Sequence, residues 1–181
     1  IILASALALM QDSPDQNSFI SIARAVKDED ELIRLGAIQG AQNMPQSERW
    51  QLLEPLLADK VLAIRSEAAA ALAPLWLNLS EQQQTKLQPA LDDYLKIQDF
   101  NADRGFAHTN RGNILAHMGH YTEAEAAYDQ SIRIEPSYST AYVNKAELYR
   151  RQSKEDKNIA TLKQGLKAQP DGGNLYYSLG L

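Results

Sequence analysis

Small residues recur at equal intervals in the second half of the chain, at Gly112, Ala146 and Gly180. A proline and a tyrosine recur with the same spacing, as Pro136 and Pro170 and as Tyr142 and Tyr176. Repeats of this length are typical of helix pairs that stack, because one pair alone cannot bury its apolar face. The spacing therefore predicts two complete helix pairs over residues 101–181, followed by a third that is cut short.

The first of these units carries the residue pattern of a known repeat. Its small, large, small, aromatic, small and proline positions are Gly112, Leu115, Ala124, Tyr128, Ser131 and Pro136. This pattern resembles the tetratricopeptide repeat, a pair of closely crossing antiparallel helices. We expect Gly112 and Ala124 to face each other at the crossing, with Leu115 and Tyr128 filling the space beside them. The second unit departs from the family at Asn158, Leu162 and Gly165.

A shorter period runs through the first half of the chain, where Asp28, Arg34 and Ala37 are repeated as Asp59, Arg65 and Ala68. In both copies an acidic turn precedes an Ala-rich helix, predicted at residues 35–41 and 67–77. Another amphipathic helix precedes each of these, at residues 14–26 and 48–57, the first with Ser13 as its N-cap. Residues 1–79 thereby resemble short HEAT-like repeats.

Residues 80–100 are predicted to form one bridging helix, because Ser80 and Gln83 have the spacing of a capping box. The expected fold is therefore all-α. It is a right-handed α-solenoid of HEAT-like helix pairs (residues 1–79), a bridging helix (80–100) and tetratricopeptide repeats (101–181, two complete and one truncated).

The charge distribution argues against a nucleic-acid partner. Residues 1–100 hold 8 basic and 14 acidic side chains, and residues 101–181 hold 10 and 9. Neither half has the clustered basic surface that displaces counterions from phosphates. The apolar segment Ile1–Met10 is too short to span a bilayer, so no membrane insertion is expected, and we interpret it as a cut helix of a longer chain.

The sequence offers no catalytic constellation. The absence of cysteine excludes disulfides, thiolate metal sites and covalent haem attachment within this stretch. Asp92 and Asp93 are adjacent on a helix, so their carboxylates diverge by about 100° and cannot act on one substrate atom. No nucleophile elbow, phosphate loop or dinucleotide-binding turn is present. We expect a chain that is not an enzyme and holds no cofactor.

The three histidines are interpreted as structural. His117 and His120 bracket a turn at Gly119 and could in principle hold a metal, but no further ligand lies nearby in sequence. We expect His117 to interact with the carbonyls at the end of its helix, and Gly119 to end that helix. His108 stands where the repeat usually has an aromatic residue and is expected to pack in that role.

The order of these parts resembles the C-terminal region of bacterial multihaem c-type cytochromes that carry tetratricopeptide repeats. HEAT-like pairs, a bridging helix and the segment Asn101–Arg104 lead into the first repeat. The resemblance implies haem-binding motifs and a signal peptide in a missing N-terminal part, and hence a periplasmic location. None of these motifs is present in this stretch.

Polar side chains form a stripe on the first helix of each repeat. Asn110, Asn113 and His117 lie at i, i+3 and i+7, and their equivalents one repeat later are Asn144, Glu147 and Arg151. In tetratricopeptide repeats this face lines the concave groove, and Asn113 and Asn144 match the asparagines that hold a peptide backbone, to which an amide can both donate and accept. Thr109, Asn174 and Ser178 replace the family's carboxylate-binding cations. The alternative is a stripe that only faces solvent.

The sequence thus predicts a scaffold that binds a protein or peptide. The predicted partner-binding residues are Asn110, Asn113, Asn144, Glu147, Arg151 and Tyr177, with Tyr177 at the open end of the groove. The alternative function is a docking appendage of a multihaem c-type cytochrome, in which the repeats pack on a missing haem domain of the same chain. A metal site is not expected.

Overall fold

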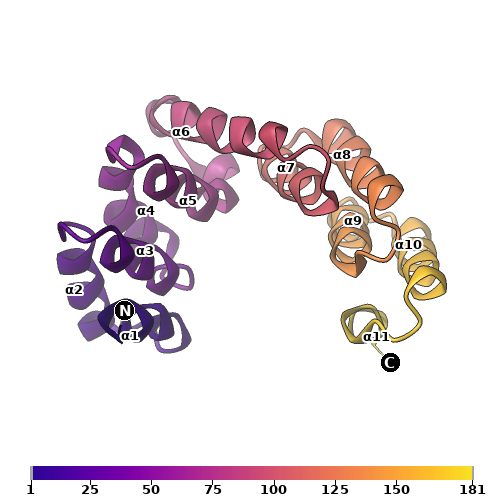
Figure 1. The fold of residues 1–181 in the computed structure, drawn as a ribbon, viewed down its shortest axis with the longest axis horizontal. Helices are drawn as coiled ribbons and strands as arrows, with labels where there is room; N and C mark the ends of the chain where they lie inside the picture. The colour runs from indigo at the N-terminus through magenta and orange to yellow at the C-terminus, as the bar shows by residue number, and fades with distance from the viewer. Residues whose placement is uncertain (1, 181) are drawn as a thin grey trace. The chain divides into compact units, whose positions relative to one another are not determined.

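The computed structural model describes residues 2–180, and this part of the chain is helical without a strand (Figure 1). The α-helices are α1 (Ile2–Leu9), α2 (Gln16–Ala25), α3 (Glu31–Gly40), α4 (Gln46–Leu53), α5 (Leu62–Leu72), α6 (Glu81–Phe100), α7 (Gly105–His117), α8 (Tyr121–Ile134), α9 (Ser139–Arg151), α10 (Glu155–Ala168) and α11 (Gly173–Leu179). Three short 3-10 helices are Met10–Asp12, Glu54–Ala58 and Ala73–Asn78. The all-α fold class is confirmed.

The chain forms two compact units that meet within α6, one up to Tyr94 and the other from Leu95 on. Each is a stack of helices around its own apolar core. In the first unit, α3 packs on α1, α2 and α5. In the second, α7 packs on α8, α9 on α10, and α11 on both α9 and α10. No helix among residues 2–180 is long and apolar enough to cross a membrane.

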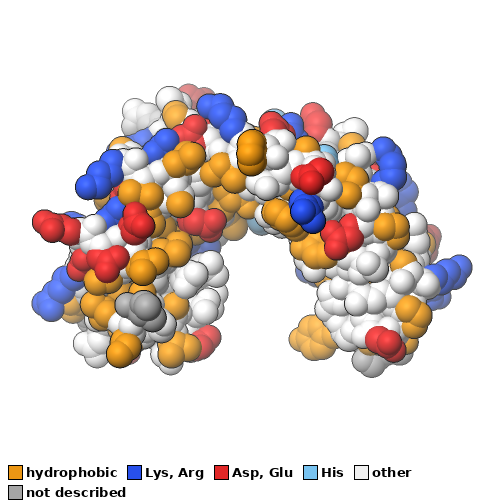
Figure 2. Space-filling view, in the orientation of Figure 1, with side chains coloured by type: hydrophobic (Ala, Val, Ile, Leu, Met, Phe, Trp, Pro, Cys, Tyr) orange, Lys and Arg blue, Asp and Glu red, His pale blue; other side chains and the backbone are white. Residues whose placement is uncertain are grey.

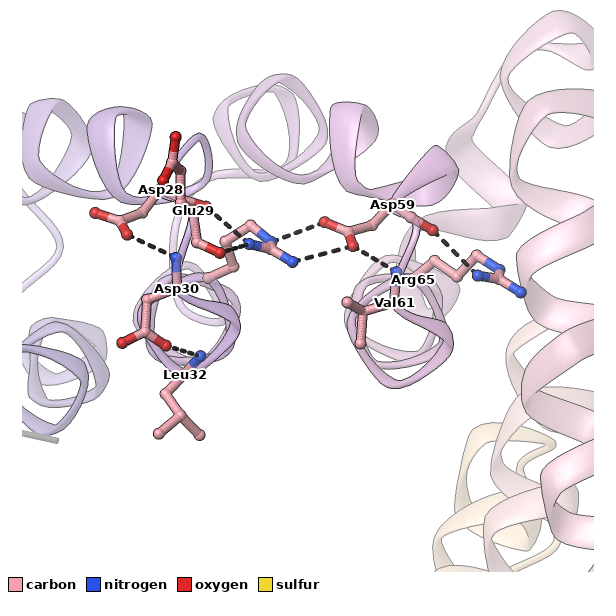
Figure 3. Close-up of polar contacts among 8 residues, drawn as sticks. Asp28, Glu29, Asp30, Leu32, Asp59, Val61 and Arg65 are labelled. Atoms are coloured by element: carbon pink, nitrogen blue, oxygen red, sulfur yellow. Dashed lines mark hydrogen bonds and ion pairs between the residues drawn. The ribbon is translucent and has the colours of Figure 1, made fainter.

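The shorter period of the first unit appears as a repeated arginine contact (Figure 3). Arg34 Nη1 donates to the carbonyl oxygens of Asp28 at 2.8 Å and Glu29 at 2.9 Å, in the turn before its own helix. Arg65 Nη1 donates in the same way to the Asp59 carbonyl oxygen at 3.1 Å. Each arginine therefore closes the turn that begins its helix.

Each of these arginines also reaches a carboxylate farther along the chain. Arg34 Nε lies 2.8 Å from Asp59 Oδ2, and the two side chains are only 6% and 9% exposed. Arg65 Nε lies 2.9 Å from Asp93 Oδ2, in a pair that is about one quarter exposed. The first pair, which is buried, thus links α3 to the turn before α5, and the second links α5 to α6.

Several predicted helix starts were wrong because an aspartate caps the helix instead. Asp15 Oδ1 accepts from Ser18 N at 2.7 Å, so Asp15 and not Ser13 begins the first long helix of the unit. Asp30 caps α3 through Leu32 N, which starts this helix at Glu31 and not at residue 35. The predicted capping box of α6 is confirmed.

The two complete helix pairs of the second unit end their first helices alike. Gly119 has φ 84° after α7, where His120 N donates to Leu115 O at 2.9 Å. Ser153, the equivalent position of the next repeat, has φ 57° after α9, where Lys154 N donates to Tyr149 O at 2.9 Å. Both turns are Schellman motifs, which favour glycine because the left-handed conformation crowds a Cβ. Gly119 thus ends its helix as predicted.

Gly112 makes the close approach expected of it. A Cβ placed on Gly112 would lie 2.6 Å from Cε1 of the Tyr128 ring, and the three atoms nearest to it all belong to that ring. Ala124 is buried with Ala116 and Leu148, in the cluster that also contains Tyr128. The small residue in this helix thus makes room above all for an aromatic ring.

Removal of the buried carboxylate in the first unit should destabilise that unit strongly. Asp59→Ala leaves the Arg34 guanidinium buried without its counter-charge, so we expect the free energy of unfolding to fall by about 3 to 5 kcal/mol. Urea denaturation followed by circular dichroism measures this. Asp103→Ala removes an exposed carboxylate, also beside an arginine, and should change the free energy by less than about 0.5 kcal/mol. Equal effects of the two substitutions would contradict the buried ion pair.

A larger residue at Gly112 should separate α7 from α8. Gly112→Leu forces the Tyr128 ring out of contact, and we expect a loss of about 1 to 3 kcal/mol in thermal or urea unfolding. Gly173→Leu is the matched control, because a Cβ on Gly173 meets nothing within 4 Å. An unchanged melting temperature for Gly112→Leu would show that the close packing on Tyr128 is wrong.

Candidate functional site

A cavity of about 250 Å³ lies in the second unit beside α7, α8 and α9. Its lining residues are Asn113, Ala116, His117, Tyr128, Asn144, Glu147, Leu148 and Arg151. Four of the six predicted site residues are among them, from α7 and from α9. The helical spacing within each helix and the repeat spacing between them thus bring these side chains to one cavity.

The two asparagines of this cavity are hydrogen-bonded to one another. Asn144 Nδ2 donates to Asn113 Oδ1 at 2.9 Å, and the Tyr128 hydroxyl donates to the same oxygen at 2.8 Å. Both lone pairs of that oxygen are therefore used. The Asn113 amide nitrogen and the Asn144 carbonyl oxygen make no hydrogen bond among residues 2–180. The pair thus presents one donor group and one acceptor to a ligand.

The charged side chains of the cavity differ in their partners. Glu147 forms a two-pronged pair with Arg150, with Nε to Oε2 and Nη2 to Oε1 both at 2.7 Å. Arg151 forms no hydrogen bond or ion pair within the described part of the chain. The Glu147 charge is therefore compensated locally, whereas the Arg151 charge is not.

His117 also lines the cavity, at the last residue of α7. Burial, reinforced by the nearby charge of Arg151, lowers the pKa of His117 to about 4. The imidazole is therefore neutral at pH 7. The predicted interaction with the carbonyls that end α7 is wrong, since the His117 ring makes no hydrogen bond to them in residues 2–180. Packing between α7 and α9 places the ring against the cavity instead.

A second cavity, of about 260 Å³, shares one lining residue with the first. It is lined by Val143, Ala146, Glu147, Arg150, Asn158, Leu162, Tyr177 and Ser178, from α9, α10 and α11. Glu147 lines both cavities. Tyr177 is 85% exposed. We call the two cavities together the groove; its lining runs from α7 through α9 to α11.

One predicted groove residue lies elsewhere than expected. Asn110 does not line either cavity of the groove; its amide nitrogen donates to Gln98 Oε1 of α6 at 3.2 Å. His108 is half-buried, and its Nε2 lies 2.9 Å from the Ala102 carbonyl oxygen, so its ring makes a polar contact that an ordinary aromatic residue would not. Among residues 2–180, no group of three histidine, cysteine or acidic side chains could hold a metal ion.

Tyr128 is the residue of the cavity that the sequence analysis assigned to packing alone. A phenol that is mostly buried needs a partner for its hydroxyl, and the first helix of the pair offers Asn113. Burial raises the pKa of Tyr128, and the Arg151 charge acts in the opposite direction. The sequence did hold a signal for this role: packing needs only an aromatic ring at this position, and the tyrosine adds a hydroxyl that must find a partner.

The pH dependence of stability should report on His117. Because the pKa of His117 is lowered from 6.5 to about 4 in the folded chain, the unfolded chain binds the proton more readily. The free energy of unfolding should therefore fall as the pH falls from about 6.5 to 4, by on the order of 1 to 3 kcal/mol. Urea denaturation of wild type and His117→Gln at several pH values isolates this contribution. The free energy of unfolding of the variant should depend less steeply on pH in this window, and its slope should equal that of wild type above pH 7. Curves that run parallel at every pH would contradict the lowered pKa of His117.

Comparison with protein families identifies the two complete helix pairs. Residues 106–138 and residues 139–171 each match the tetratricopeptide repeat family. No curated protein matches the chain. These comparisons give no support to the HEAT-like or the cytochrome resemblance. Repeats of this family generally mediate protein–protein interaction, and two of them follow one another over residues 106–171, the segment that contributes all but the last helix of the groove.

Proposed function

We propose that this chain is a protein-interaction scaffold that holds an extended polypeptide segment in the groove of its second unit. The observation that carries the proposal is that the two cavities share a wall. Glu147 lines both, and the first helices of successive tetratricopeptide repeats supply most of the walls. A segment that follows this lining would contact α7, α9 and α11 in turn.

The asparagine pair suits a peptide backbone. Asn113 offers its amide N–H groups and Asn144 offers its carbonyl oxygen, because the Asn113 oxygen already accepts from Asn144 and from Tyr128. A peptide unit has one C=O and one N–H, so its needs match this pair. Such contacts are independent of sequence, and hydrogen bonds between neutral groups contribute only about 0.5 to 1.5 kcal/mol each.

Apolar contacts would supply the remaining affinity. Ala116 and Leu148 are buried in the wall of the first cavity, whereas Val143 and the exposed Tyr177 line the second. Tyrosine offers a large contact area with few rotatable bonds, which makes it effective at protein interfaces. Tyr177 is thus the residue most available for a side chain of the partner.

Binding, not catalysis, is the activity that this lining supports. The Glu147 carboxylate is held by Arg150, and burial raises the pKa of the Tyr128 hydroxyl, so neither is a ready base or nucleophile at neutral pH. The alternative of a docking appendage on a multihaem cytochrome in the periplasm rests on the sequence resemblance alone. We therefore base the proposed function on the groove.

The asparagine pair provides the test. Asn144→Ala removes the open acceptor but leaves the bond from Tyr128 to Asn113, and Asn113→Ala with Asn144→Ala removes both groups. We expect the double variant to bind a partner peptide about five- to a hundredfold more weakly than wild type, and the single variant to lie between. Isothermal titration with peptides taken from proteins captured by the wild-type chain measures this.

Asn110→Ala is the matched control, since the Asn110 amide bonds to Gln98 outside the groove. It should bind as wild type does. Urea denaturation of each variant checks that the chain remains folded, because Asn113→Ala leaves the Tyr128 hydroxyl without its partner. Equal affinities of the double variant and wild type, or contacts that map to the first unit, would refute the groove as the binding surface.

A further inference from the structure

Arg151 leaves the first cavity with an uncompensated positive charge. Two other cations of the second unit do have carboxylate partners: Lys145 Nζ lies 2.6 Å from Asp129 Oδ1, and Arg111 Nη1 lies 2.8 Å from Asp99 Oδ1. Arg151 has none in residues 2–180. The one acidic side chain of the lining, Glu147, is held by Arg150 through both of its oxygens. The cavity therefore favours an anion.

The Arg151 charge acts on the cavity interior as well as on solvent. It contributes, after burial, to the lowered pKa of His117, and it opposes the effect of burial on the pKa of Tyr128. These two residues belong to α7 and α8, whereas Arg151 ends α9. His117 and Tyr128 both line the cavity, so the electrostatic effect of the Arg151 guanidinium extends across it.

A second donor faces the same space. The Asn113 amide nitrogen makes no hydrogen bond among residues 2–180, while its oxygen is held in place by two donors. A guanidinium and a fixed amide donor together match the two oxygens of a carboxylate. The guanidinium is the better cation for this task, since its planar fork can donate to both oxygens.

We propose that the first cavity selects an acidic side chain, Asp or Glu, of the bound segment. Its carboxylate accepts from Arg151 and from one of the two N–H groups of the Asn113 amide, and the other N–H remains for the backbone. This inference rests on the proposed function and names the chemistry of the partner. A side chain fits better than a chain terminus. The groove continues past Glu147 to Tyr177, and the open oxygen of Asn144 needs an N–H from a continuing backbone.

Three synthetic peptides test the inference on the whole chain. The first is a capped hexapeptide with a central glutamate and apolar side chains for the second cavity, and the second has glutamine in place of the glutamate. The third has the glutamine but ends in a free carboxylate. Nuclear magnetic resonance titration follows the side-chain N–H signals of Arg151 and Asn113 and yields a dissociation constant for each peptide.

The glutamate peptide should bind about tenfold more tightly than the glutamine peptide at low salt and shift both signals. The preference should disappear in Arg151→Gln. Arg133→Gln is the matched control: it removes the same charge from an exposed site where Arg133 contacts only Gln130. It should keep the preference, so a general effect of net charge is separated from the contact at Arg151.

The outcomes distinguish this inference from the proposed function. Equal binding of the glutamate and glutamine peptides, with both weakened by Asn144→Ala, would overturn the acidic preference and leave the groove intact. Tighter binding of the free-carboxylate peptide would overturn the choice of a side chain. The absence of any shift at the cavity with all three peptides would overturn both proposals.

Discussion

The Tyr128 side chain connects the packing of the first tetratricopeptide repeat to the chemistry of its groove. Its ring fills the space opposite Gly112, where even a Cβ would be too close. Its hydroxyl holds the oxygen of Asn113, which in turn accepts from Asn144 of the next repeat. The polar network thus rests on a buried ring. The contact between two repeats and the shape of the groove therefore depend on the same side chain.

The first unit joins its repeats by a different means, the arginine and aspartate series. Arg34 and Arg65 each close the turn before their own helix and pair with a carboxylate farther along. A buried ion pair adds little stability over an apolar contact of the same volume, but the loss of one partner is costly. The pair between Arg34 and Asp59 links α3 to the turn before α5 in this way. Figure 2 shows that exposed basic and acidic side chains are interspersed over the visible face, without one dominant sign.

The sequence predicted the elements better than their contacts. The tetratricopeptide period places Asn113 and Asn144 on equivalent faces, and these two residues share a hydrogen bond. The same period also predicts Asn110 in the groove, but the Asn110 amide nitrogen donates to Gln98 Oε1 instead. Periodicity specifies the face of a helix, whereas the neighbour that covers a given turn is set by the packing of other elements. Asn110 lies near the middle of α7 and bonds to Gln98 of α6, and no spacing within the repeat encodes that helix.

The packing of Gly112 shows the same limit at closer range. A small residue at a helix crossing indicates close approach, but either a second small residue or an aromatic ring can fill the space. In this chain the Tyr128 ring fills the space, and its hydroxyl donates to Asn113. The N-terminus of α2 differs in kind, since Ser13 and Asp15 are both good N-caps two residues apart. Only the side chain that reaches Ser18 N begins the helix.

The charges of the groove set the kind of binding that it can support. Arg151 is exposed and screened by salt, so it contributes more to selectivity and to the rate of encounter than to affinity. The buried walls at Ala116 and Leu148 are small, and each cavity is near the lower end of the size of a small-molecule site. Affinity must then accumulate along an extended segment, across both cavities. A partner that fills only the first cavity would keep its preference for an acidic group and lose most of its binding free energy.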